Sequence, residues 1–141
     1  MFEDVEVLHN AIEIMIERVV LTDNHDTATE KIVILEFSDF EEIVVKNSLE
    51  HDLNLQKTYP FEFLEELRDS EFMLSILNDS DDEKKLSCTI PIDKLVKRNE
   101  DHNRQNNIAC VVMDSILIRS EDNAKVGYVD YRLRFKYPYK Q

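Results

Sequence analysis

Hydrophobic and polar residues alternate along most of this chain. In residues 11–20, Ile12, Ile14 and Ile16 fall on one side of an extended chain, while Glu13 and Glu17 fall on the other. Successive side chains of a β-strand project to opposite faces, so this pattern is typical of a strand with one buried face. Similar strand-like segments follow at residues 31–37, 43–45, 59–63, 72–76, 86–92, 108–113 (with a possible extension to 118) and 126–136.

Polar segments rich in turn-forming residues separate these strands, at residues 22–27, 47–55, 78–83 and 97–107. Residues 64–69 and 93–96 read as short helices. The pattern therefore predicts an all-β fold, an eight-stranded antiparallel β-sandwich with one or two short helices in its connections. Pro60 cannot donate a hydrogen bond to a neighbouring strand, so we expect it in an edge strand or at the start of its strand. The sandwich domain is expected over residues 11–138, with a tail or short helix at 1–10 and a tail at 139–141.

The charge balance narrows the classes of partner. The chain of 141 residues suits one domain, and it carries 30 acidic against 17 basic side chains, a net charge of −13. Such an excess of negative charge disfavours nucleic acid and anionic membranes as partners. No stretch approaches the roughly 20 apolar residues that span a bilayer, and no signal peptide opens the chain. We therefore expect a cytoplasmic protein.

Catalytic motifs are not found in the sequence. Gly127 is the only glycine, so no phosphate-binding glycine loop can be formed. Cys88 and Cys110 lie within apolar strand-like segments, where a buried free thiol is the expected state. The histidines lack the paired spacing of a zinc site; they are His9, His25, His51 and His102. A small hydrolase would need a catalytic pair that the sequence does not offer, so we do not expect an enzyme.

Two acidic loops raise the question of calcium. Asp79 and Asp81 follow directly on an apolar strand, while Asp23 and Glu30 belong to an earlier loop. Loops at one end of a sandwich can converge, and calcium takes six to eight oxygen ligands. This arrangement of strands and acidic loops resembles the C2 domain. Lys84 stands close to the place where calcium-binding members of that family carry a further aspartate, so the ligand set is incomplete and the loops can equally be solvated acidic loops.

A closer resemblance lies within one branch of the family. Residues 37–41, Phe-Ser-Asp-Phe-Glu, resemble a turn in the C2 domain of the retinitis pigmentosa GTPase regulator-interacting protein family. Residues 47–61 are similar to the loop and strand that follow that turn. Residues 108–110 and the glycine, aromatic and arginine pattern of 126–134 are similar to its last strands. The resemblance extends from about Ile12 to Pro138.

The resemblance implies a function as a scaffold domain. Members of that family use C2 domains beside coiled coils to bind other ciliary proteins, at the transition zone or basal body. The implied function is calcium-independent protein–protein interaction, with ciliary or centrosomal proteins as partners, no cofactor and no metal. The alternative is a calcium-dependent phospholipid-binding C2 domain, whose ligands would be Asp23, Glu30, Asp79 and Asp81.

Two surfaces are candidates for partner binding. Outward positions of the last strand place Tyr128, Arg132, Arg134 and Lys136 in a stripe, which we call the β8 stripe. This basic stripe could attract an acidic peptide or a phosphoinositide headgroup. Carboxylates on the neighbouring strand could equally neutralise it. The second candidate is a sheet edge that accepts a strand from a partner, with the Pro60 strand as the expected edge.

Overall fold

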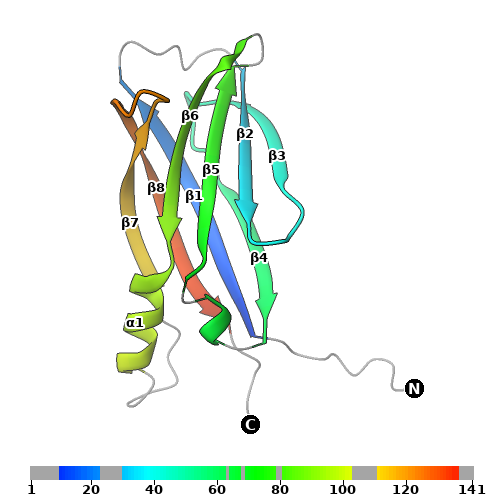
Figure 1. Ribbon diagram of the computed structural model, residues 1–141, viewed down its shortest axis with the longest axis vertical. Helices are drawn as coiled ribbons and strands as arrows, with labels where there is room; N and C mark the ends of the chain where they lie inside the picture. Colours follow the sequence, from blue (N-terminus) through cyan, green and yellow to red (C-terminus); the bar gives the residue numbers. More distant parts are fainter. Residues whose placement is uncertain are drawn as a thin grey trace, which may run out of the picture.

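The computed structural model describes residues 10–22, 30–62, 64–67, 69–78, 81–102 and 111–136, without the side chains of residues 64, 78, 81–84 and 98–102. The predicted tails at 1–10 and 139–141 lie outside this part of the chain, apart from Asn10. The described elements, in chain order, are β1 (Asn10–Leu21), β2 (Glu30–Phe37), β3 (Ile43–Ser48), β4 (Leu55–Phe61), the 3-10 helix η1 (Leu64–Leu67), β5 (Glu71–Asn78), β6 (Asp81–Pro91), α1 (Asp93–His102), β7 (Val111–Arg119) and β8 (Lys125–Lys136) (Figure 1).

The strands form a curled antiparallel sheet in the order β3-β2-β5-β6-β7-β8-β1-β4. One registered pair, Ser87 with Arg119, joins β6 to β7, whereas the other neighbours pair over most of their lengths. The sheet therefore folds over at this junction, and its two halves face each other as the layers of a sandwich (Figure 1). The predicted eight-stranded antiparallel sandwich is confirmed.

Side chains from both halves meet in one hydrophobic core. In β8 the alternate residues Val129, Tyr131, Leu133 and Phe135 are buried, as the alternation predicts. Across the two layers, the ring centroid of Tyr59 in β4 lies 5.0 Å from that of Phe37 in β2 and 5.8 Å from that of Phe72 in β5. These cross-layer contacts show that the two inward faces pack directly on each other.

Element boundaries differ from the sequence expectation where polar residues are involved. Strand β6 begins at Asp81, within the segment 78–83 that the sequence predicts as a loop, because Asp81 pairs with Asn78 and extends the β5–β6 hairpin. Helix α1 continues to His102, into the predicted loop at 97–107. Ile92, Leu95 and Val96 anchor its first turn in the core, and three of the six polar residues that follow, Lys97, Arg98 and Glu100, are good helix formers. Strand β7 begins at Val111, and the predicted start at residue 108 lies outside the described residues.

The predicted edge position of the Pro60 strand is confirmed, because β4 pairs with β1 alone at one end of the strand order. Strand β3 is at the other end. The β1–β8 register shifts between Ile16 and Arg18, so Glu17 has no partner residue in β8. The backbone amides of Leu53 and Asn54 donate to the carbonyl of Glu17, over 2.8 and 3.2 Å. The irregularity in β1 thereby anchors the loop that leads into β4.

Candidate functional site

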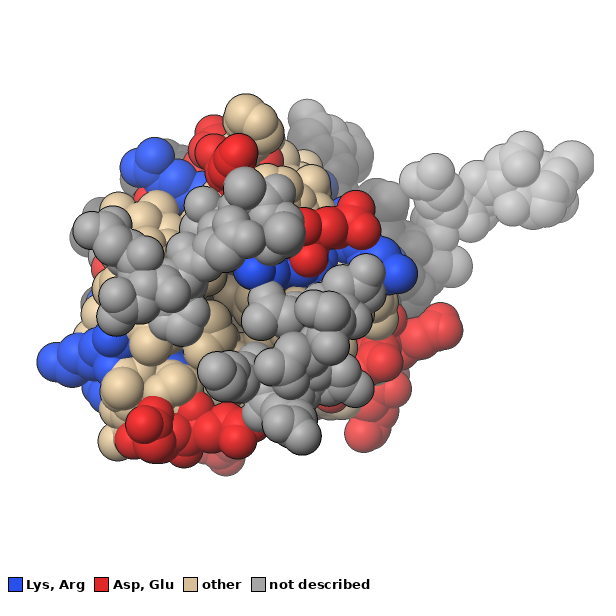
Figure 2. Space-filling view, turned by 90° about the horizontal axis from the view of Figure 1, so that it is seen from above, with Lys and Arg blue, Asp and Glu red and all other residues tan. Residues whose placement is uncertain are grey.

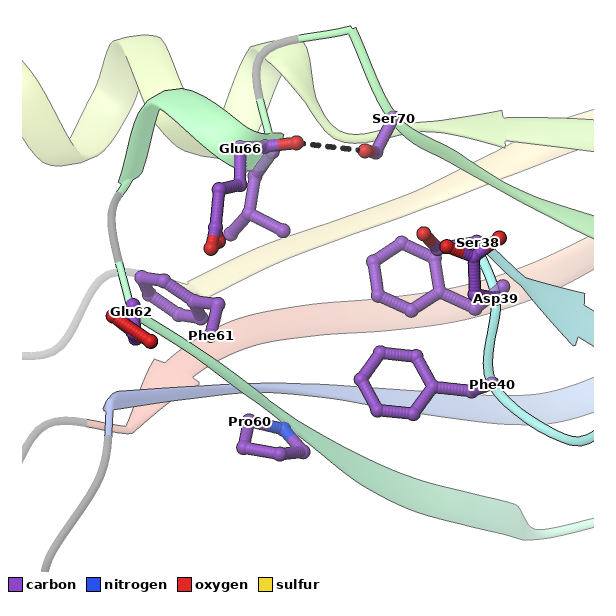
Figure 3. A pocket seen from close by; sticks show the side chains of 10 residues that line it. Ser38, Asp39, Phe40, Pro60, Phe61, Glu62, Glu66 and Ser70 are labelled. Atoms are coloured by element: carbon purple, nitrogen blue, oxygen red, sulfur yellow. Dashed lines mark hydrogen bonds between the residues drawn. The ribbon is translucent and has the colours of Figure 1, made fainter.

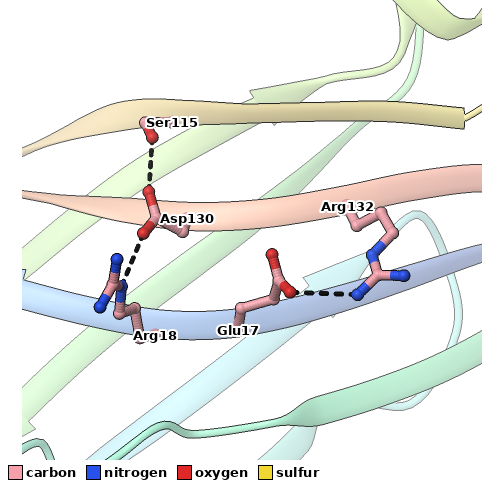
Figure 4. A network of polar contacts seen from close by, with 5 residues as sticks. All are labelled: Glu17, Arg18, Ser115, Asp130 and Arg132. Atoms are coloured by element: carbon pink, nitrogen blue, oxygen red, sulfur yellow. Dashed lines mark hydrogen bonds and ion pairs between the residues drawn. The ribbon is translucent and has the colours of Figure 1, made fainter.

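The β8 stripe lies on the outer face of the sandwich, and β1 supplies its counter-charges. Arg134 Nε is 2.5 Å from Glu13 Oε1, and Lys136 Nζ is 3.1 Å from Glu13 Oε2. At the preceding outward position of β8, Arg132 Nη2 is 3.1 Å from Glu17 Oε2 (Figure 4). Each of these three cations therefore has a carboxylate partner within its own sheet.

Glu13 is the most enclosed charge of this surface, with 5% of the residue exposed. Besides its two ion pairs it accepts a hydrogen bond of 2.5 Å from Gln56 Nε2 of β4. Burial alone would raise the pKa of Glu13, but the hydrogen bonds from Arg134, Gln56 and Lys136 outweigh that effect and lower the pKa to about 2. Glu13 is thus ionised throughout the physiological range and ties β4, β1 and β8 together.

A second polar network crosses β1, β8 and β7 (Figure 4). Arg18 Nε lies 2.8 Å from Asp130 Oδ2, and Ser115 Oγ donates to Asp130 Oδ1 over 2.5 Å. The hydrogen bond from Ser115, followed by the contacts with Arg18, lowers the pKa of Asp130. The face expected to be basic is therefore a set of cross-strand ion pairs, the neutralised arrangement that the sequence left open. Partner binding through the β8 stripe stays a prediction.

The candidate calcium ligands fall largely outside the described residues. Asp23 and Asp79 lie outside them, and for Asp81 only the backbone is described. Glu30 is exposed at the start of β2. Among the residues that the structure does describe, no group of three or more acidic, histidine or cysteine side chains could hold a metal ion. Figure 2 shows the end of the sandwich at which β5 and β6 are joined. The described acidic side chains form several separate groups there, with basic side chains between them.

A lysine is buried at this same end. Lys31 alternates with Val33 and Leu35 on the inward face of β2, and 6% of it is exposed. In the sheet it stands opposite Asn78, the last residue of β5. A positive charge is thus enclosed between the layers where β2 begins and β5 ends.

Cys88 is buried in β6, where desolvation raises the pKa of its thiol to about 12. Such a thiol stays protonated and is a poor nucleophile. Cys110 lies outside the described residues. No helix in the described part of the chain is long and apolar enough to cross a membrane.

A hollow of about 510 Å³ opens at the other end of the sandwich (Figure 3). We call it the end hollow. Three segments that are distant in sequence form it: the β2–β3 turn, the end of β4, and the stretch from η1 to the start of β5. The described residues that line it are Phe37, Ser38, Asp39, Phe40, Pro60, Phe61, Glu62, Glu66, Leu67 and Ser70.

The aromatic wall of the end hollow is held by the β2–β3 turn. The amide of Phe40 donates to the carbonyl of Phe37 over 3.1 Å, and Ser38 adopts a φ of 50° within this turn. The Phe40 ring stacks parallel to that of Phe37, with centroids 5.9 Å apart, and packs on Tyr59 at 4.9 Å. Phe40 nevertheless remains 41% exposed. A large aromatic ring is thus partly exposed to solvent while it packs on Phe37 and Tyr59.

Acidic side chains surround this apolar wall. Asp39, Glu62 and Glu66 line the end hollow and are exposed, and the described lining residues include no lysine, arginine or histidine. Figure 3 shows Glu66 and Glu62 on the side of Phe61, across the hollow from Phe40. The hydroxyl of Ser70 donates to the Glu66 carbonyl over 2.9 Å and fixes η1 against the start of β5.

Sequence reasoning does not find the end hollow. It predicts a turn at Phe37–Glu41 and an edge strand at residues 59–63, but nothing in either segment indicates that they meet η1. The available signal is Phe40, an aromatic residue inside a polar turn, where alternation alone would not place one.

No protein-family model and no curated protein matches the sequence. Solved structures do resemble the fold. A C2 domain-containing protein of an elicitor-responsive gene superposes with a TM-score of 0.63 at 11% identity, covering 94% of this chain and 93% of that chain. A C2 domain of plant Extended Synaptotagmin 1 superposes with a TM-score of 0.58 at 11% identity, covering 96% of this chain and 100% of that chain. A calcium-bound structure of two consecutive C2 domains from Extended-Synaptotagmin 2 superposes with a TM-score of 0.57 at 9% identity. The match covers 96% of this chain and 47% of that chain. The chain described here has the C2-domain fold.

Proposed function

We propose that this C2-fold domain binds a segment of a partner protein in the end hollow, and that binding needs no calcium. The observation that carries the proposal is the exposed ring of Phe40, held by a hydrogen-bonded turn beside a hollow of about 510 Å³. An aromatic side chain that is rigid before binding loses little conformational entropy when a partner covers it. The end hollow has the features of a docking site, and its described lining offers no nucleophile paired with a base.

Independence from calcium is supported by the incomplete set of candidate ligands. Lys84 stands close to the place where calcium-binding members of the C2 family carry a further aspartate. A lysine there supplies no oxygen ligand, whereas calcium takes six to eight oxygens.

The place of the domain in the cell is also part of the proposal. The resemblance to the retinitis pigmentosa GTPase regulator-interacting protein family supports a scaffold function at the ciliary basal body or transition zone. It rests on the turn at Phe37–Glu41, on the loop and strand of residues 47–61, on residues 108–110 and on the pattern of the last strand. The turn is the segment that forms the aromatic wall of the end hollow. Ciliary or centrosomal proteins are the partners that this proposal names.

The alternative is calcium-dependent phospholipid binding through Asp23, Glu30, Asp79 and Asp81. It is kept because one of the similar solved structures, Extended-Synaptotagmin 2, is calcium bound. Thermal unfolding in calcium and in chelator separates the two functions, because a ligand that binds only the folded state raises the melting temperature. We expect equal melting temperatures and no co-sedimentation with anionic liposomes. A rise of several degrees in calcium, together with calcium-dependent sedimentation, would favour the alternative.

The docking function is tested by comparing what variants capture from extracts of ciliated cells in the presence of chelator. Phe40→Ser removes the exposed ring of the end hollow. Met113→Ser is the matched control, since Met113 is an exposed apolar residue on the outer face of β7, 67% exposed. We expect proteins that the wild type and Met113→Ser retain but Phe40→Ser loses. Equal capture by all three proteins would refute docking in the end hollow.

A further inference from the structure

The charge of the end hollow specifies the chemistry of its occupant. We propose that the end hollow selects a partner segment in which an arginine or lysine stands next to an apolar or aromatic side chain. This inference rests on the function proposed above and names the class of peptide that the site takes. It is carried by two observations together. The end hollow has an apolar wall, formed by Phe37, Phe40, Pro60, Phe61 and Leu67. It also has a rim of charged side chains, and the described ones, Asp39, Glu62 and Glu66, are all negative.

The apolar wall supplies the larger share of the binding free energy. Phe40 stands 41% exposed against Phe37 and Tyr59, and Pro60, Phe61 and Leu67 complete the lining. A hollow of about 510 Å³ falls within the usual size range of ligand pockets and takes one or two side chains of a peptide. An apolar group that enters it leaves water and covers the Phe40 ring.

The acidic residues of the rim favour a partner segment with a positive charge. Asp39, Glu62 and Glu66 attract a cation and repel phosphate, anionic lipid headgroups and acidic peptides. A guanidinium can stack on the exposed ring of Phe40 while it donates to a rim carboxylate, a combination for which arginine is better suited than lysine. One basic side chain, Lys57, lies near the aromatic cluster, with its Nζ 6.0 Å from the centroid of Tyr59, but it is not among the described residues that line the end hollow.

The rim carboxylates are exposed, so their pairs with a bound cation are individually weak. Pairs of this kind contribute about 0.2–1 kcal/mol each. Removing two of them should therefore weaken binding by about fivefold. The same pairs are screened by salt, so the preference for a basic residue should diminish at high ionic strength.

The experiment is a selection from a phage-displayed random heptapeptide library on the wild-type domain in chelator. We expect enrichment of peptides with Arg or Lys beside Phe, Tyr, Leu or Pro. The synthetic form of the most enriched peptide is then titrated by calorimetry into the wild type and two double variants. Glu62→Gln with Glu66→Gln removes rim charges, and Glu50→Gln with Glu121→Gln removes the same number of exposed charges elsewhere. We expect about a fivefold loss of affinity for the first double variant and less than a twofold change for the second.

The outcomes separate this inference from the proposed function. Peptides that are apolar but not basic, and that lose binding to Phe40→Ser, would overturn the charge preference while leaving docking in the end hollow intact. Peptides that bind Phe40→Ser as well as the wild type, or no enrichment at all, would refute both. Equal affinity losses in the two double variants would show a general charge effect and overturn the selectivity of the rim. Melting curves of all variants confirm that each protein is folded.

Discussion

Replacing Glu13 with glutamine tests whether the charges of β1 and β8 act as one structural unit. The change keeps the shape of the side chain but removes the charge that contacts Arg134 at 2.5 Å and Lys136 at 3.1 Å. It also places an amide nitrogen donor close to these cations. We expect Glu13→Gln to lower the free energy of unfolding at neutral pH, and the effect to become smaller as the pH falls toward 2.

The size of the effect follows from the pKa of Glu13. Although burial acts to raise this pKa, the hydrogen bonds from Arg134, Gln56 and Lys136 lower it from 4.5 to about 2. Because one pKa unit corresponds to about 1.4 kcal/mol, the shift sets an upper limit of about 3.5 kcal/mol. Arg134 and Lys136 are 43% and 45% exposed, so water screens the pairs and the expected contribution is about 1–2 kcal/mol.

The assay is urea denaturation of the wild type and Glu13→Gln between pH 7 and pH 3. A carboxylate with a lowered pKa in the folded state stabilises the protein above its unfolded-state pKa of 4.5, and this stabilisation is lost as the pH falls toward 2. The difference between the two proteins should therefore fall by about half between pH 7 and pH 3. Glu36→Gln, at an exposed position on the outer face of β2, is the control and should change little. A difference that is constant with pH, or equal to that of the control, would refute the reasoning.

Three further predictions concern the fold. A Cβ on Gly127 would overlap the carbonyl oxygen of Val20, so Gly127→Ala should lower the urea midpoint by an amount equivalent to about 1–3 kcal/mol, and an unchanged midpoint would contradict the close approach. Ser38 has a φ of 50°, so Ser38→Gly should raise stability by about 0.5–1 kcal/mol, and a lower melting temperature would contradict this. In a Cys110→Ser variant the remaining thiol of Cys88, whose pKa burial raises to about 12, should react with a thiol reagent at pH 8 only upon unfolding; rapid labelling of the folded protein would show that the thiol is accessible.

Side-chain alternation was sufficient to predict the fold because strands such as β2 and β8 alternate between a buried and a more exposed face. Ile12, Ile14 and Ile16 in β1 point inward as expected, and Pro60 marks an edge strand as its missing amide requires. The prediction of loops from polar sequence was wrong where backbone pairing or a few buried apolar residues extended a strand or a helix into a polar segment. Helix α1 extends into a polar stretch because Leu95 and Val96 hold its first turn in the core.

The candidate sites were less accessible to sequence reasoning because they depend on contacts between distant segments. The outward position of Arg134 could be predicted, but its pairing with Glu13 requires the β1–β8 register. The end hollow requires a turn after β2, the end of β4 and η1 to meet, and no local pattern encodes that meeting. Lys31 falls in the apolar phase of its strand, yet only the packed layers show that it is enclosed.

The central claim is that the end hollow binds a basic, partly apolar segment of a partner without calcium. The most direct measurement is a titration of the ¹⁵N-labelled domain with the selected peptide, followed by amide chemical shifts in chelator. We predict that the largest shifts fall at residues 37–40, 60–62 and 66–70, and that added calcium leaves them unchanged. Shifts concentrated along β8, or shifts that appear only in calcium, would contradict the claim.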